Sequence, residues 1–205
     1  MILEQLRDAA RIRLGVPANE NFYQSQQLDS LLNEALQTIS VENAWPWLQT
    51  TTTFATVAGT RFYTPPSNWQ RTKALSIDGY DPLTFLDLQE IRAWPDSVTD
   101  VPMFYTIYQE QIYLAPTPSA VYTMRHDYIR QETKLLDDTD APVMPIQFQY
   151  SILAFAAHLA YLRAGDLPRA QAALTEYNGW KKRMEEARPR SSSTIKVRVR
   201  PGREI

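Results

Sequence analysis

The sequence offers few side chains with the chemistry of a catalytic base or nucleophile. It contains two histidines, His126 and His158, and no cysteine. A Ser-His-Asp arrangement would need one of these two imidazoles, while cysteine nucleophiles, disulfides and thiolate metal sites are excluded. His158 follows Phe155 in an apolar stretch, and His126 alternates with Met124 and Tyr128. Such neighbours are typical of packed helices and sheets, so we interpret both histidines as structural.

An acidic group, Asp137, Asp138 and Asp140, is the only cluster that suggests a hard-cation site. The Ca²⁺ loop of helical hairpins also needs a glycine at its sixth position and a glutamate at its twelfth, and neither is found here. We therefore interpret the cluster as a polar turn in which Asp side chains bond to nearby backbone. The six glycines form no phosphate-binding loop. We predict no catalytic residue, no metal site and no cofactor.

A pair of carboxylates for glycoside hydrolysis can come from distant positions, and nothing in the sequence selects one pair. The five tryptophans and eleven tyrosines could form a sugar or base platform, although they serve core and interface packing more often. A peptidoglycan hydrolase therefore stays open as an alternative function.

The last residues alternate in the manner of a β-strand. Ile195, Val197 and Val199 fall on one face, and the other face holds Lys196, Arg198 and Arg200. No neighbouring strand in the sequence can pair with this segment, so we predict that it adds to the sheet edge of another protein. Its basic side chains would steer it to an acidic surface or to nearby DNA. The alternative is a disordered terminus.

The bulk composition is that of a globular protein. The chain has 205 residues, 44% of them hydrophobic and 21% charged, and its net charge is −2. This charge argues against duplex DNA binding by the folded body, because such proteins need a basic face. We find no apolar run that spans a bilayer and no signal peptide, and we expect synthesis in a cytoplasm.

Helical periodicity appears at both ends of the chain. A first helix is predicted over 2–14, ended by Gly15, and a second begins after a plausible N-cap at Ser25. An apolar helix follows Pro145, and Pro168 lies in the first turn of the last helix.

Between the helices the period changes to two, which predicts about six short strands. A turn at 58–60 should join the first two strands as antiparallel neighbours, and a turn at 78–79 should join the next two. Asp87 should cap a short helix, and 96–102 reads as a loop before strands at 104–108, 111–114 and 122–129.

These elements predict an α+β fold. Residues 1–49 and 141–188 would form a helical body with a four-helix core of two N-terminal and two C-terminal helices. Residues 50–140 would form an inserted small antiparallel β domain, and 189–205 an extended C-terminal arm.

Several ordered motifs resemble the head-to-tail adaptor proteins of tailed bacteriophages, also called connector or head-completion proteins. The matching stretches are YTPPSNWQRTKALSIDG at 63–79 and IYLAPTPSAVYTMRHDYI at 112–129. They are followed by Asp138, Asp140, Pro142 and Pro145 before the third long helix, and by Asp166 and Ala170 at the start of the last one. The long 50–130 segment is closer to adaptors of short-tailed phages, or to their tubular tail proteins.

The resemblance implies a structural virion protein at the head-tail interface and not an enzyme. Family members form a ring of twelve subunits beneath the portal, extend the DNA channel and offer an attachment surface to a tail or nozzle protein. DNA would pass through without sequence-specific binding, and no membrane is involved. The arm of family members reaches into the portal, so residues 195–200 would add to portal strands.

Overall fold

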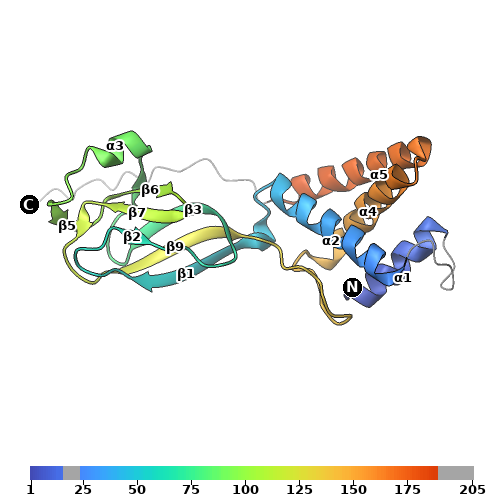
Figure 1. Ribbon diagram of the computed structural model, residues 1–205, viewed down its shortest axis with the longest axis horizontal. Helices are drawn as coiled ribbons and strands as arrows, with labels where there is room; N and C mark the ends of the chain where they lie inside the picture. The colour runs from blue at the N-terminus through green and yellow to red at the C-terminus, as the bar shows by residue number, and fades with distance from the viewer. Residues whose placement is uncertain (16–23, 189–205) are drawn as a thin grey trace, which may run out of the picture.

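A computed structural model describes residues 1–15 and 24–188, which form a helical part and a β-rich part lying end to end (Figure 1). This confirms the predicted α+β class. The helices are α1 (Leu3–Leu14), α2 (Ser25–Glu42), α3 (Leu88–Arg92), α4 (Tyr150–Arg163) and α5 (Leu167–Glu186). The strands are β1 (Gln49–Ala55), β2 (Phe62–Tyr63), β3 (Trp69–Ile77), β4 (Thr84–Phe85), β5 (Thr99–Asp100), β6 (Phe104–Tyr108), β7 (Gln111–Ala115), β8 (Thr117–Pro118) and β9 (Thr123–Arg130).

Local signals explain several helix ends. Gly15 closes α1 in the left-handed conformation, with φ of 69°, and its N–H bonds to the carbonyls of Arg11 and Ile12. The side chain of Asp87 accepts bonds from the N–H groups of Gln89 and Glu90, as expected for the cap of α3. The predicted cap of α2 was wrong by one residue: the N-cap is Gln24, and Ser25 is already helical.

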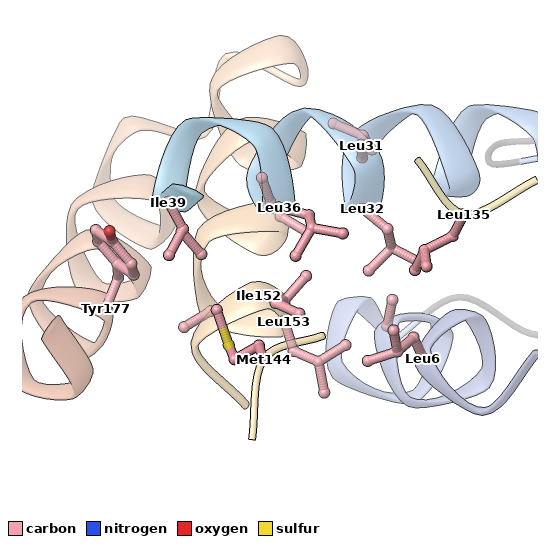
Figure 2. Packing of buried hydrophobic residues seen from close by; sticks show 14 of the residues in the cluster. Leu6, Leu31, Leu32, Leu36, Ile39, Leu135, Met144, Ile152, Leu153 and Tyr177 are labelled. Carbon is pink, nitrogen blue, oxygen red and sulfur yellow. The ribbon is translucent and has the colours of Figure 1, made fainter. Parts of the chain in front are cut away.

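The helical part is built around one hydrophobic cluster (Figure 2). Leucines of α1 and α2 meet the apolar face of α4, and Leu6, Leu32, Leu36 and Ile152 are fully buried there. Tyr177 of α5 also belongs to this cluster. Each such aliphatic side chain contributes about 2 kcal/mol through burial. No helix within 1–15 or 24–188 is long and apolar enough to cross a membrane.

The strands form three sheets, which we call A, B and C. Sheet A has the order β1-β9-β3, sheet B the order β2-β7-β6-β4, and sheet C pairs β5 with β8. The two predicted hairpins were therefore wrong, because β1 and β2 enter different sheets, as do β3 and β4. Burial decides this pairing: Phe54 of β1 lies opposite the buried Met124 of β9, far along the chain.

The β-rich part has its own hydrophobic cluster, which includes Leu75, Ile112, Leu114 and Met124. The described residues hold nine strands instead of about six. Two of the additional strands, β5 and β8, are a short parallel pair, and β5 lies within the predicted 96–102 loop. Two residues per strand give too little periodicity to be recognised in a sequence.

Candidate assembly interface

The predicted partner-binding residues, Ile195, Lys196, Val197, Arg198, Val199 and Arg200, lie outside the described residues. The structure does show where the end of α5, which precedes these residues in sequence, lies in the molecule. Asn43, just after α2, donates to Glu185 at 3.0 Å, and Arg188 donates to the Asn43 side-chain oxygen at 3.4 Å. The end of α5 therefore lies beside the end of α2, at the junction between the helical and β-rich parts (Figure 1).

One edge of sheet A is open. In the described residues β1 pairs only with β9, in unbroken register from Gln49 opposite Ile129 to Ala55 opposite Thr123. The strand carries no charged residue, no proline and no bulge, and four of its seven residues are threonine. An edge with these properties is a ready template for another strand.

The opposite edge of sheet A is protected. The pairing of β3 with β9 shifts register twice, and Arg71 and Lys73 lie exposed on β3. The N–H of Leu83 also bonds to the carbonyl of Leu75 at 2.8 Å. Bulges and charges of this kind discourage strand addition, so the two edges of the sheet differ in kind.

Large apolar side chains are exposed on both parts of the molecule. Phe85 of β4 is 58% exposed, and Met103, just before β6, is 51% exposed. The backbones of these two segments are adjacent, because the Thr84 N–H bonds to the Met103 carbonyl. On the helical part Ile146 and Tyr150 are exposed. Grouped apolar residues at a surface are typical of protein contacts.

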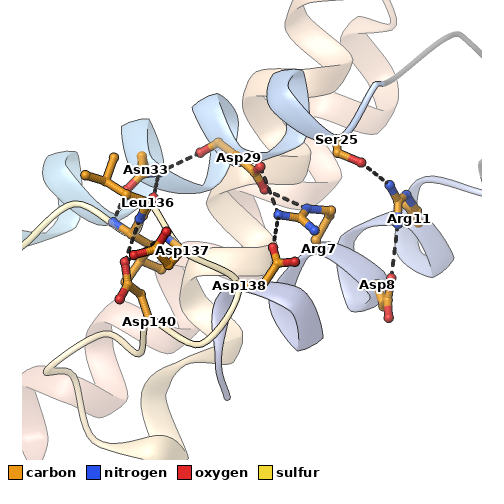
Figure 3. A network of polar contacts seen from close by, with 11 residues as sticks. Arg7, Asp8, Arg11, Ser25, Asp29, Asn33, Leu136, Asp137, Asp138 and Asp140 are labelled. Atoms are coloured by element: carbon orange, nitrogen blue, oxygen red, sulfur yellow. Dashed lines mark hydrogen bonds and ion pairs between the residues drawn. The ribbon is translucent and has the colours of Figure 1, made fainter.

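A polar network fixes the segment that returns from β9 to the helices (Figure 3). Arg7 makes two bonds to Asp29, at 2.8 and 3.0 Å, and one to Asp138 at 2.7 Å. The Asp29 hydrogen bonds contribute most to raising the pKa of the Arg7 guanidinium. This network ties α1, α2 and the 131–144 segment together.

The acidic cluster is a polar turn, as predicted. The carboxylate of Asp140 accepts bonds from the backbone N–H groups of Asp137 and Leu136, at 2.9 and 2.7 Å. These two bonds lower the pKa of Asp140. The carboxylate of Asp138 is bound by Arg7, so these side chains organise the turn and its contact with α1.

Further contacts hold the same segment against α2. Asn33 both donates to the Leu135 carbonyl, at 2.9 Å, and accepts from the Leu135 N–H, at 2.8 Å. Glu132 is only 4% exposed, and its carboxylate accepts from the N–H groups of Thr133 and Val143. Burial raises the pKa of Glu132 in spite of these bonds.

A shallow groove of about 560 Å³ runs along α2 and contains two carboxylates, Asp29 and Glu34. Asp29 is bound by Arg7, and Glu34 accepts from Arg163 at 2.5 Å. The acid of a glycosidase lies in an apolar setting, whereas both carboxylates of this groove are bound by arginines. The groove therefore gives no support to the hydrolase alternative.

Both histidines have the structural surroundings that the sequence predicts. His126 is 0% exposed, and its Nε2 lies 2.9 Å from the hydroxyl of Thr72. Burial lowers the pKa of His126 to about 4. His158 pairs its Nδ1 with the carbonyl of Ala170 at 2.9 Å, which joins α4 to α5.

Arg61 was not singled out in the sequence, yet it organises sheet B. It is 6% exposed, its Nε donates to the Leu114 carbonyl at 3.2 Å, and it forms an ion pair with Asp96. Its guanidinium also stacks over the ring of Tyr113, 4.5 Å from the centroid. These partners lie more than thirty residues away in sequence, so no local pattern reveals them.

The polar side chains of both parts hold elements together, while one strand edge and several apolar groups face outward. This distribution fits an assembly protein that works by binding other proteins. A family model described as SU10 adaptor protein matches residues 1–201, and the chain belongs to this family. It is therefore a bacteriophage adaptor of the head-to-tail class, a structural component of the virion. No curated protein gives a match.

Proposed function

We propose that this protein is a head-to-tail adaptor that docks under the portal as a ring of twelve copies. The ring extends the DNA channel and provides the attachment surface for a tail or nozzle protein, so it takes part in head completion and later in DNA ejection. The observation that carries this proposal is the family match over residues 1–201. DNA passes through the channel without sequence-specific binding, in keeping with a net charge of −2.

The C-terminal arm is the proposed contact with the portal. Residues 195–200 alternate apolar and basic side chains, which suits addition to a strand edge. The chain leaves the described body beside the end of α2, at Arg188. The arm therefore extends a surface that the body alone does not have.

Contacts between neighbouring copies use the exposed apolar groups. Phe85 and Met103 at sheet B, and Ile146 and Tyr150 on the helical part, are separate patches. A ring subunit needs two different neighbour-facing surfaces, because its contacts are head to tail around the axis. Within each subunit, residues 1–49 and 141–188 form a four-helix body that carries the 50–140 β domain as an insertion.

Ordered binding provides the mechanism. A free subunit is made in the host cytoplasm and stays monomeric, because the ring contacts of a single pair do not repay the loss of freedom on association. The portal supplies adjacent sites, so each docked copy raises the effective concentration of its neighbours.

A pull-down on the portal protein tests the docking proposal. We expect the full-length chain to be retained and a chain ending at Arg190 to be lost, since only the first carries the proposed strand. Far-UV circular dichroism of both proteins is the control for folding. Equal retention of the two would show that the arm does not bind the portal.

Sedimentation of the isolated full-length protein tests the assembly order. The expected result is a monomer at micromolar concentration, with rings appearing only when portal is added. Stable rings of the isolated protein would contradict the ordered mechanism while leaving the adaptor function intact.

A further inference from the structure

We propose that in the free subunit residues 195–200 pair with the open edge of β1 in the same chain, as a fourth strand of sheet A. The described body has an unprotected strand edge at β1, whose seven residues lack charge, proline and bulges. The sequence outside it has one segment with strict strand alternation and no partner in the chain's own order. A free edge and an unpaired strand in one molecule satisfy each other's backbone groups.

The position of the chain end favours this pairing. Arg188 is bonded to Asn43, and β1 begins six residues after Asn43, at Gln49. The β1 strand runs away from this junction (Figure 1), so an arm leaving from the same place would run parallel to it. The six intervening residues, 189–194, span up to about 20 Å when extended, which allows a reach to the edge.

Tethering selects the same chain over a neighbour. A segment joined to the body by only six residues has an effective concentration on the order of millimolar, far above the micromolar concentration of free subunits. Pairing within one chain is therefore expected in dilute solution, and exchange between copies is not.

The side chains match as well as the backbone. On β1, Thr50, Thr52 and Phe54 are half-buried and lie opposite buried residues of β9, whereas Thr51 and Thr53 are exposed. If the arm pairs with β1 so that its apolar residues share the face of Thr50, Thr52 and Phe54, then Ile195, Val197 and Val199 extend this half-buried face. Lys196, Arg198 and Arg200 then share the exposed face with the threonines and remain in water.

This pairing bears on assembly, because one strand cannot fill two edges. In the free subunit the arm covers the β1 edge, through which separate copies could otherwise associate by strand pairing. If the arm also serves the portal, as proposed above, the portal edge and β1 compete for it. The pairing with β1 itself concerns the isolated protein and does not depend on that docking.

The natural absence of cysteine makes a cross-linking test specific. Two cysteines would be introduced at exposed positions, Thr53→Cys on β1 and Arg198→Cys on the arm, and a short bismaleimide added to the isolated protein. We expect a link within one chain, seen as a monomer of altered mobility. The matched control is Arg71→Cys with Arg198→Cys, which reports the protected edge of β3 and should link several-fold less.

Three outcomes would overturn the proposal: no link, equal links to both edges, or links that join two chains. Adding Val197→Pro to the Thr53→Cys and Arg198→Cys pair keeps the chain length but removes a backbone donor, and it should reduce the link several-fold. Hydrogen exchange supplies a measurement free of cysteines: β1 amides should exchange faster in a chain ending at Arg190. A failed portal pull-down with a positive cross-link would reject the docking role alone, and the reverse pattern would reject this inference alone.

Discussion

His126 lies inside sheet A, between strands that leave its imidazole no contact with water. Its pKa is lowered to about 4 by burial, and the smaller influence of neighbouring Asp127 acts in the opposite direction. In the unfolded chain a histidine has a pKa of about 6.5. Between these two values the unfolded state binds a proton that the folded state does not, so the free energy of unfolding falls as the pH falls.

We predict that, through His126, the free energy of unfolding falls by about 3 kcal/mol as the pH is lowered from 7 to 4. Above about pH 6.5 His126 should make it change no further. His126→Gln keeps a polar group near Thr72 but cannot take up the proton. The measurement is urea unfolding of both proteins across this range, because carboxylates common to both cancel in the difference. Parallel pH curves for the two proteins would contradict the prediction.

Asn33 is a second residue with a measurable role, since it satisfies both backbone groups of Leu135. Asn33→Ala should lower the free energy of unfolding by about 2 kcal/mol, because the two bonds to Leu135 and a third to the Asp29 carbonyl are lost in a partly buried place. Asn33→Asp keeps the acceptor but places a carboxylate oxygen against the carbonyls of Asp29 and Leu135, so it should lose at least as much. Chemical denaturation at neutral pH measures both changes, and an effect equal to that of exposed Ser30→Ala would refute this role.

At the scale of elements, two glycines give opposite expectations for the same substitution. Gly15 ends α1 with φ of 69°, whereas Gly179 lies within α5 at an ordinary helical φ. Neither has an atom within 4 Å of an added Cβ, so backbone conformation alone decides the outcome.

Gly15→Ala should destabilise the protein by about 1 kcal/mol, because alanine is strained in the left-handed region. Gly179→Ala should stabilise it by about 0.5–1 kcal/mol through helix propensity and a less disordered unfolded chain. Thermal unfolding measures both. A shift of the same sign for the two variants would show that the cap of α1 does not act as described.

Sequence patterns predicted the existence of elements far better than their pairing. The strand at 104–108, the helix cap at Asp87 and the buried face of His126 follow from period and capping, which are local properties. The partner of β1 does not, because β9 lies about seventy residues later and hairpin rules consider only neighbours. Among the groups of the candidate interface, the arm was visible as a pattern, whereas the open edge of β1 required the sheet order.

On the scale of the whole molecule, the described core is divided into two hydrophobic clusters, one in each part. Strand β9 contributes to both, with Met124 in the β-rich cluster and Ile129 in the helical one. Separate clusters predict that the two parts open as separate cooperative units.

Leu36→Ala in the helical cluster should cost about 3 kcal/mol through the cavity it leaves. Native-state hydrogen exchange should then show faster exchange in α2 and α4, with little change in β6 and β7. Leu114→Ala provides the reciprocal variant for the β-rich cluster. Equal acceleration everywhere would mean that the chain opens as one unit and would contradict the predicted division at residues 50–140.

Within residues 24–188 the chain crosses twice between the two parts, once from α2 into β1 and once from β9 back toward α4. Trp45 anchors the first crossing by burial and by a bond from its indole nitrogen to the Ile39 carbonyl, and Asn33 and Glu132 anchor the second. A single tether would let the β-rich part swivel freely. Because both connections are anchored, a torque applied to one part is transmitted to the other. Each copy can therefore resist twisting between its two parts.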